Sequence, residues 1–219
     1  MSRLDHDTNE WQCKIVLFGA PTLAAVKLAA RVVTTFPANE REVVWDNPPA
    51  DDPTLVARYR PNASSLGELQ PVYGIHTFRS AGSTATDRQH LLHNTDGVIL
   101  LIDNDDLEQS QFAERELERF LGMFGKTIES MPVVFLSTQP LDESQQAMFH
   151  VGNHSLFAGD TPANLQRAVT TLTSRLEEDS GLAGIGFDLD DFEEDSEEID
   201  LDDVEFDDWH AYDDEEPTA

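Results

Sequence analysis

The chain has 219 residues, enough for one α/β domain with a tail or for two very small domains. Its 43 acidic and 14 basic residues give a formal net charge of −29, which disfavours non-specific binding to nucleic acid or to an anionic membrane. Its single cysteine, Cys13, excludes an intramolecular disulfide, and no apolar run reaches the ~20 residues of a membrane helix. The first residues, with Asp5, Asp7 and Glu10, do not resemble a signal peptide, so we expect a cytoplasmic protein.

The negative charge is concentrated at the end of the sequence. Residues 176–219 contain 21 acidic residues and no lysine or arginine, whereas the rest of the chain holds 22 acidic and 14 basic residues. A glycine-rich hinge at 181–186 precedes most of this acidic segment. We therefore expect a flexible N-terminus over 1–10, a folded domain over 11–178 and a disordered acidic tail over 179–219.

Hydrophobic patterning predicts alternating strands and helices. Apolar or alternating runs predict strands at 14–18, 43–45, 72–79, 97–103, 132–136 and 155–157. Helical patterns cover 22–36, 88–93, 107–124 and 161–178. The proline-rich stretch 46–71 predicts a long connection with one helical turn near Leu55. Such alternation indicates a doubly wound, mainly parallel α/β sheet covered on both faces, with ligands expected at the carboxyl ends of the strands.

The segment that follows the first predicted strand, at 14–18, has the spacing of a known ligand-binding loop. The segment Gly19-Ala-Pro-Thr-Leu-Ala-Ala-Val-Lys27 has the position and length of a phosphate-binding P-loop. In the pattern G-x-x-x-x-G-K-[ST], the second glycine falls on Ala24, the lysine on Ala25 and the Ser/Thr on Val26.

Four later segments extend the pattern. Phe78-Arg-Ser-Ala-Gly-Ser83 resembles the W-D-T-A-G-Q segment of Ras-like small GTPases. Residues 96–106, running into 113–117, resemble the ADP-ribosylation-factor branch and the bacterial gliding-motility (MglA-type) GTPases. Residues 132–142 stand where the family has N-K-x-D, and 157–161 where it has S-A-x-x-G. The order and spacing of these landmarks imply a Ras-like P-loop fold; the alternative is another doubly wound α/β domain.

The resemblance also implies where a degenerate nucleotide site would lie. Its remnant falls on Gly19, Ala24, Ala25, Val26, Arg79, Gly82, Asp142 and Ala158. In the family, the P-loop lysine neutralises phosphate and the adjacent hydroxyl ligates Mg²⁺, which Ala25 and Val26 cannot do. Arg79 replaces the magnesium-side aspartate, and Asp142 keeps the base-reading acid in only one of two possible registers.

These losses predict a pseudo-GTPase. Three missing charge-assisted bonds, at ~1.5–3 kcal/mol each, would weaken nucleotide binding by about three to six orders of magnitude. We therefore expect no catalytic residue, no metal and no cofactor. GTP and Mg²⁺ enter only under the alternative of a divergent GTPase or ATPase, in which Arg79, Lys27 and the acids near Asp103 act as substitutes.

Other chemistry-bearing residues have simpler explanations. Asp103, Asp105, Asp106 and Glu108 could bind a cation, but a solvated helix N-terminus, where acids are favoured, explains them. Cys13 opens a buried strand and is expected to be an inert core residue.

The tail combines acids with regularly placed aromatic residues: Phe187, Phe192, Phe206, Trp209 and Tyr212. This composition favours docking on a basic, grooved protein partner over two alternatives, a solvating role and docking on the protein's own net-negative domain.

Together these features predict a non-enzymatic signalling or scaffolding protein that uses its switch-side surface and its tail. The family resemblance suggests a bacterial polarity or surface-motility system. A second alternative is an acidic nucleic-acid mimic that occupies the groove of a DNA- or RNA-binding partner.

Overall fold

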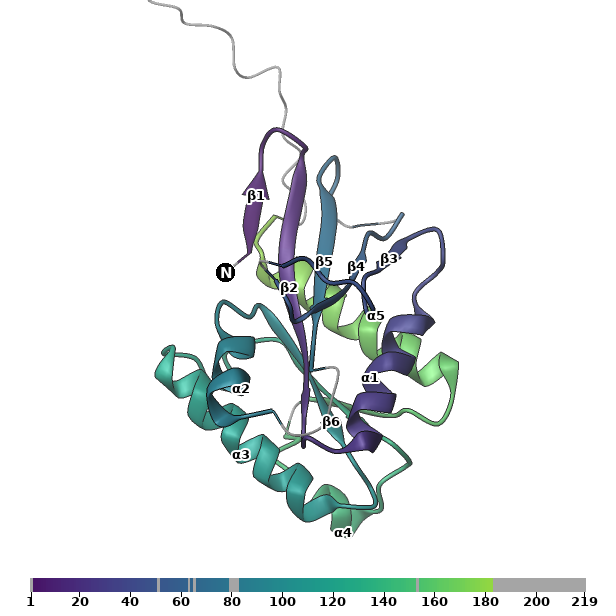
Figure 1. Ribbon diagram of the computed structural model, residues 1–219, viewed down its shortest axis with the longest axis vertical. Coiled ribbons are helices and arrows are strands. Elements are labelled where there is room, and N and C mark those ends of the chain that lie inside the picture. The colour runs from purple at the N-terminus through teal and green to yellow at the C-terminus, as the bar shows by residue number, and fades with distance from the viewer. Residues whose placement is uncertain are drawn as a thin grey trace, which may run out of the picture. The chain divides into compact units, whose positions relative to one another are not determined.

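The secondary structure alternates between strands and helices along most of the sequence. In a computed structural model, the described residues are 2–50, 52–62, 64, 66–78, 83–152 and 154–182 (Figure 1). The strands are β1 (Arg3–Asp5), β2 (Glu10–Gly19), β3 (Arg41–Val43), β4 (Leu55–Tyr59), β5 (Gln70–His76), β6 (Gly97–Ile102), β7 (Val133–Ser137) and β8 (Ser155–Ala158). The helices are α1 (Leu23–Thr35), α2 (Ala85–Leu92), α3 (Leu107–Met123), α4 (Glu143–Gln146) and α5 (Pro162–Asp179). Within the described part of the chain, no helix is long and apolar enough to cross a membrane.

All eight strands belong to one sheet, in the order β3-β4-β5-β2-β6-β7-β8, with β1 paired to β2. Strands β5, β2, β6, β7 and β8 are parallel, whereas β3, β4 and β1 run antiparallel to their neighbours. This mostly parallel α/β sheet is compatible with a Rossmann or P-loop-like fold. Because β5 and β6 flank β2, the carboxyl end of β2 lies at the point where the strand order reverses, the usual ligand position in such sheets.

The side chains of β2 point alternately to the two faces of the sheet, so the core has two layers. Cys13, Ile15 and Leu17 pack with α1 and α5 on one face, whereas Val16 and Phe18 pack with α2 and α3 on the other (Figure 1). Successive side chains of a strand point to opposite faces, so a strand buried on both sides reads as a continuous apolar run. Cys13 is 4% exposed, and burial raises the pKa of its thiol far above the ordinary value, which fits the inert core role expected of it.

Most of the predicted elements are confirmed, but the stretch 46–71 is not. It contains strand β4 instead of a helical turn, with Leu55, Val56 and Ala57 buried and β5 as its antiparallel partner. The prolines of this stretch lie outside β4, so they do not interrupt its hydrogen bonds. Residues 1–10, in which no regular element was expected, contain β1 and the start of β2.

Candidate functional site

The turn after β2 is short. Strand β2 ends at Gly19, only three residues follow, and α1 begins at Leu23. A Cβ atom on Gly19 would lie 2.8 Å from both the Cβ and the carbonyl oxygen of Leu101 on β6. Glycine is therefore required here for the close approach of β2 and β6, independently of any phosphate.

Three positions aligned with the P-loop pattern lie inside the first turns of α1 instead of in a loop. Ala24 and Val26 are half-buried, and Ala25 is buried in the core. A phosphate-binding loop needs main-chain N–H groups directed inward around the anion. Here Pro21 supplies no N–H, and the amide of Ala25 is already bonded to the side chain of Thr22.

Thr22 and Asp103 close the N-terminus of α1. The Thr22 hydroxyl oxygen accepts from the Ala25 amide at 3.1 Å, as an N-cap does, while its O–H donates to Asp103 Oδ2 at 3.0 Å. Asp103 is 5% exposed and also accepts from the amide of Asp105 at 3.1 Å. The expectation that Asp103 lies at a solvated helix N-terminus is therefore wrong. The residue that caps α3 is Asp106. A negative carboxylate stands close to the helix end that would otherwise favour a phosphate.

A buried arginine fixes the same region from α2. Arg88 Nε donates to Glu116 Oε2 at 2.6 Å, and Nη1 donates to the carbonyl oxygen of Gly19 at 2.8 Å. Its guanidinium carbon lies 4.3 Å from the centre of the Phe18 ring. Nη2 is buried and has no hydrogen-bond partner among the described residues. Arg88 belongs to no sequence motif, and its partner Glu116 lies 28 residues away, so the sequence alone gives no signal for it.

Little space remains between these groups. The cavity at this position, lined by residues that include Gly19, Ala25, Thr77 and Arg88, has a volume of about 20 Å³. Such a volume holds about one water molecule, whereas small-molecule sites have volumes of roughly 300–1,000 Å³. Larger hollows lie elsewhere: one of about 390 Å³ over β2, β4 and β5, one of about 830 Å³ beside β7 and α5, and one of about 440 Å³ between α1 and the start of α5.

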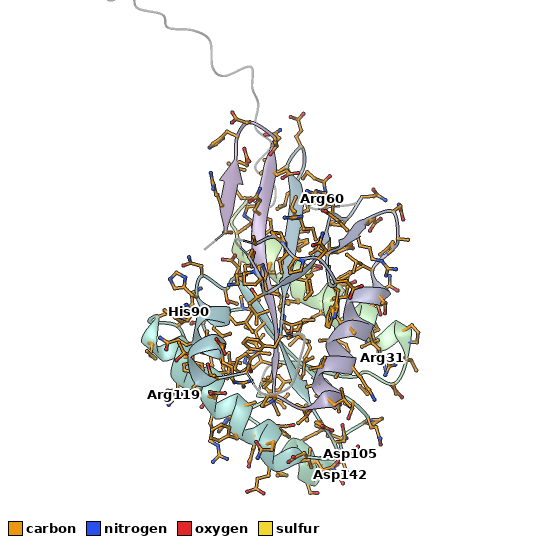
Figure 2. The ribbon with its side chains drawn as sticks, in the orientation of Figure 1. Arg31, Arg60, His90, Asp105, Arg119 and Asp142 are labelled. Atoms are coloured by element: carbon orange, nitrogen blue, oxygen red, sulfur yellow. The ribbon has the colours of Figure 1, made fainter. Side chains whose placement is uncertain are left out.

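The loop after β7, aligned with the base-reading motif, is held by Asn104. Asn104 Oδ1 accepts from the Gln139 amide and from the Thr138 hydroxyl, both at 2.9 Å. Asp142 is the N-cap of α4, and Figure 2 shows it near the α4 end of the molecule. The Asp142 carboxylate accepts from the Gln145 amide at 2.9 Å and from the Ser144 hydroxyl at 2.7 Å, and these bonds lower its pKa.

Of the eight aligned residues, the six that the structure describes are thus not gathered into one pocket. Gly19, Ala25 and Val26 line the small cavity, whereas Asp142 caps α4 and Ala158 ends β8 beside Ser137. Arg79 and Gly82 lie outside the described residues, as do the five aromatic residues of the tail. In the described part of the chain, no three His, Cys, Asp or Glu side chains are placed to hold a metal ion. No protein-family model matches this sequence, and comparison with curated proteins gives no significant match.

Proposed function

We propose that the chain is a Ras-like domain without nucleotide chemistry, a pseudo-GTPase that acts by protein–protein contacts. The observation that carries this proposal is the N-terminus of α1, where Thr22 occupies the Ala25 amide and the buried Asp103 carboxylate is bonded to the Thr22 hydroxyl. The strand order and the mostly parallel sheet are compatible with the P-loop-like architecture that the sequence resemblance implies.

Electrostatics supports the same proposal. A bound triphosphate would bring several negative charges beside the buried Asp103 carboxylate, and Ala25 offers no cation to offset them. The charge of Arg88 is already compensated by the buried Glu116, and among its donors only Nη2 has no partner within the described residues. Moving Arg88 away from Glu116 towards a phosphate would break a buried ion pair, which is strongly unfavourable.

Thermal unfolding of the full chain tests the loss of nucleotide binding. A ligand present at about 100 times its dissociation constant adds about 2.7 kcal/mol of stability, which raises the unfolding midpoint measurably. We expect the midpoint to stay unchanged with millimolar GTP, GDP or ATP in the presence of Mg²⁺. A clear rise with one of them would favour the divergent GTPase or ATPase instead.

The proposed contacts involve the switch-side surface and the acidic segment with its aromatic residues from Phe187 to Tyr212. In this proposal, the partner for that segment is a protein with a basic groove, and the role is signalling or scaffolding in cell polarity or motility, by analogy with the family. Capture experiments with the full chain and with a variant lacking residues 181–219 test this part. We expect the deletion to abolish capture; equal capture by both proteins would contradict a role for the tail. Loss of a captured partner on addition of nucleic acid would instead support the nucleic-acid mimic.

A further inference from the structure

The outer face of α3 carries large apolar side chains that the described fold does not cover. Phe112 is 58% exposed and Met123 is 59% exposed, and both lie on this helix. Their separation is close to three helical turns, which take about 10.8 residues, so the two side chains stand on one side of α3. Met148 is also exposed, and its carbonyl accepts from the Gln111 side chain at 2.7 Å, which places it beside the same helix.

Two arginines stand between these apolar side chains. Arg115 and Arg119 are exposed, and Arg119 lies on the side of α3 that is turned away from the sheet (Figure 2). Residues that recur every three or four positions share one side of a helix. The exposed residues with this spacing on α3 are here called the α3 stripe: Glu108, Phe112, Arg115, Arg119 and Met123.

Neither arginine of the α3 stripe takes part in an ion pair with the residues that the structure describes. Arg115 Nε donates to the Gln111 carbonyl at 3.4 Å, and the Arg119 guanidinium lies over the Phe120 ring. A guanidinium has five N–H donors, so each arginine keeps donors for a further acceptor. The acids nearest to them on α3 face other residues: Glu116 faces Arg88, whereas Glu114 and Glu118 face His150.

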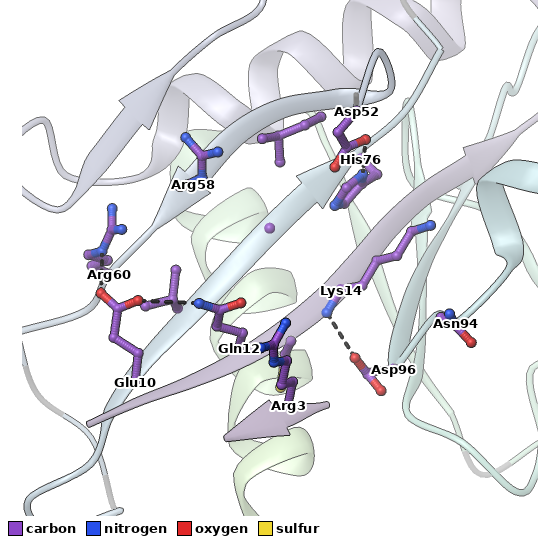
Figure 3. A pocket seen from close by; sticks show the side chains of 14 residues that line it. Arg3, Glu10, Gln12, Lys14, Asp52, Arg58, Arg60, His76, Asn94 and Asp96 are labelled. Carbon is purple, nitrogen blue, oxygen red and sulfur yellow. Dashed lines mark hydrogen bonds and ion pairs between the residues drawn. The ribbon is translucent and has the colours of Figure 1, made fainter. Parts of the chain in front are cut away.

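The hollow over β2, β4 and β5 shows the opposite pattern. There Arg60 lies 3.5 Å from Glu10, and His76 Nδ1 lies 3.5 Å from Asp52 (Figure 3). Charged side chains of that hollow therefore face opposite charges within the chain, whereas the two arginines of the α3 stripe are available to a partner.

The composition of the α3 stripe indicates what kind of partner fits it. Aromatic residues, methionine and arginine are enriched at the centres of protein interfaces. Two cations between apolar ends are matched by a helix that carries two acids between large apolar side chains. A second copy of this chain does not offer that match. When α3 is paired with itself in either direction, Arg115 faces an arginine, and two chains of net charge −29 repel each other.

We propose that the α3 stripe binds an amphipathic helix of a partner protein, in which two carboxylates flanked by large apolar side chains meet Arg115 and Arg119. Phe112 and Met123 supply the apolar contacts at the two ends. This partner is acidic and therefore differs from the basic partner proposed for the acidic segment. The inference stands whether or not the chain binds nucleotide, because no residue of the stripe lines the cavity beside Gly19.

Two fluorescent synthetic helical peptides are the probes, and fluorescence anisotropy with the full chain at about 0.15 M salt measures their binding. Both present two leucines about three turns apart on one face; the first has two glutamates between them and the second has two glutamines. We expect the glutamate peptide to bind with a micromolar dissociation constant and the glutamine peptide at least about tenfold more weakly. The net charge of the chain favours the opposite order, so this result would report the local arginines.

Variants of the full chain locate the binding site. Phe112→Ser and Arg115→Gln should each weaken binding of the glutamate peptide by about tenfold. The matched controls are Leu23→Ser and Arg31→Gln, because both residues are exposed on α1, which packs on the opposite face of the sheet. They should bind the peptide like the unmodified chain. Circular dichroism of each variant separates a lost site from a lost fold.

The proposal is overturned if the glutamate peptide does not bind saturably, if it binds no more tightly than the glutamine peptide, or if Phe112→Ser and Arg115→Gln bind it as well as the controls do. Two other occupants would overturn it as well. A dimer in sedimentation that Phe112→Ser dissociates would assign the α3 stripe to a second copy. Peptide binding that appears only after deletion of residues 181–219 would assign it to the acidic segment of the chain itself.

Discussion

The buried pair Arg88–Glu116 offers the sharpest stability test. The two side chains are 5% and 7% exposed and meet at 2.6 Å, and Arg88 also bonds the carbonyl of Gly19 and covers the ring of Phe18. Arg88→Met keeps an apolar stem of similar length but leaves Glu116 as a buried charge without its partner. Such a change costs about 3–5 kcal/mol, a large share of the roughly 5–15 kcal/mol that stabilises a typical domain.

The double variant Arg88→Met/Glu116→Leu separates the cost of an orphaned charge from the value of the pair. Replacing both members of a buried pair with apolar residues is often neutral or stabilising. The Gly19 carbonyl still loses its donor, which costs about 1–3 kcal/mol. We therefore expect the double variant to be more stable than Arg88→Met, with a coupling free energy of at least about 2 kcal/mol.

Urea unfolding of the full chain at pH 7, followed by circular dichroism, measures these differences. Arg119→Met is the control, because Arg119 is exposed on α3 and its guanidinium carbon lies 4.8 Å from the centre of the Phe120 ring. It should cost less than about 1 kcal/mol. A loss below about 1 kcal/mol for Arg88→Met, or additive effects in the double variant, would refute the structural role given to this pair.

Three further changes probe separate parts of the fold by urea unfolding. Tyr73→Phe should cost about 1–3 kcal/mol, since the buried Tyr73 hydroxyl donates to Glu177 at 2.8 Å; an unchanged stability would show that this bond contributes nothing. The pKa of His76 is lowered to about 4 from 6.5, so the folded state favours the neutral ring. The contribution of this preference to the free energy of unfolding is complete above about pH 6.5 and is lost as the pH falls towards 4. His76→Gln should therefore remove about 3 kcal/mol of the stability change between those pH values, and an unaltered pH profile would contradict the shift. Gly19→Ala, which brings a Cβ to 2.8 Å from atoms of β6, should destabilise the fold by at least about 1 kcal/mol. Its control, Gly122→Ala, has open space around it on α3 and should be neutral or stabilising. Equal effects of the two changes would exclude the close approach of β2 and β6.

Much of the fold could be predicted because parallel strands buried on both faces leave a strong signal. The continuous apolar runs of β2, β6 and β7 mark their positions, and Thr161 before Pro162 marks the start of α5. Strand β4 was missed because its five residues are too short for a periodic signal beside the prolines, and its stability comes from pairing with β5.

The candidate site was harder to predict, because its decisive contacts are long-range. The apolar run located the turn after Gly19, and the resemblance to a P-loop placed the position of its lysine on Ala25. The contacts that close the turn connect residues far apart in sequence: Thr22 with Asp103 and Arg88 with Gly19. From the sequence alone, Arg88 cannot be distinguished from an arginine on the exposed face of a helix, because the partner that compensates its charge is unknown.

Equilibrium dialysis of the purified full chain against labelled GDP, GTP and ATP, with Mg²⁺, tests the central claim most directly. With α1 capped by Thr22, Asp103 bonded to the Thr22 hydroxyl and only about 20 Å³ free beside them, we predict no saturable binding at nucleotide concentrations up to about 1 mM. One nucleotide bound per chain with a dissociation constant below about 10 μM would contradict the pseudo-GTPase account.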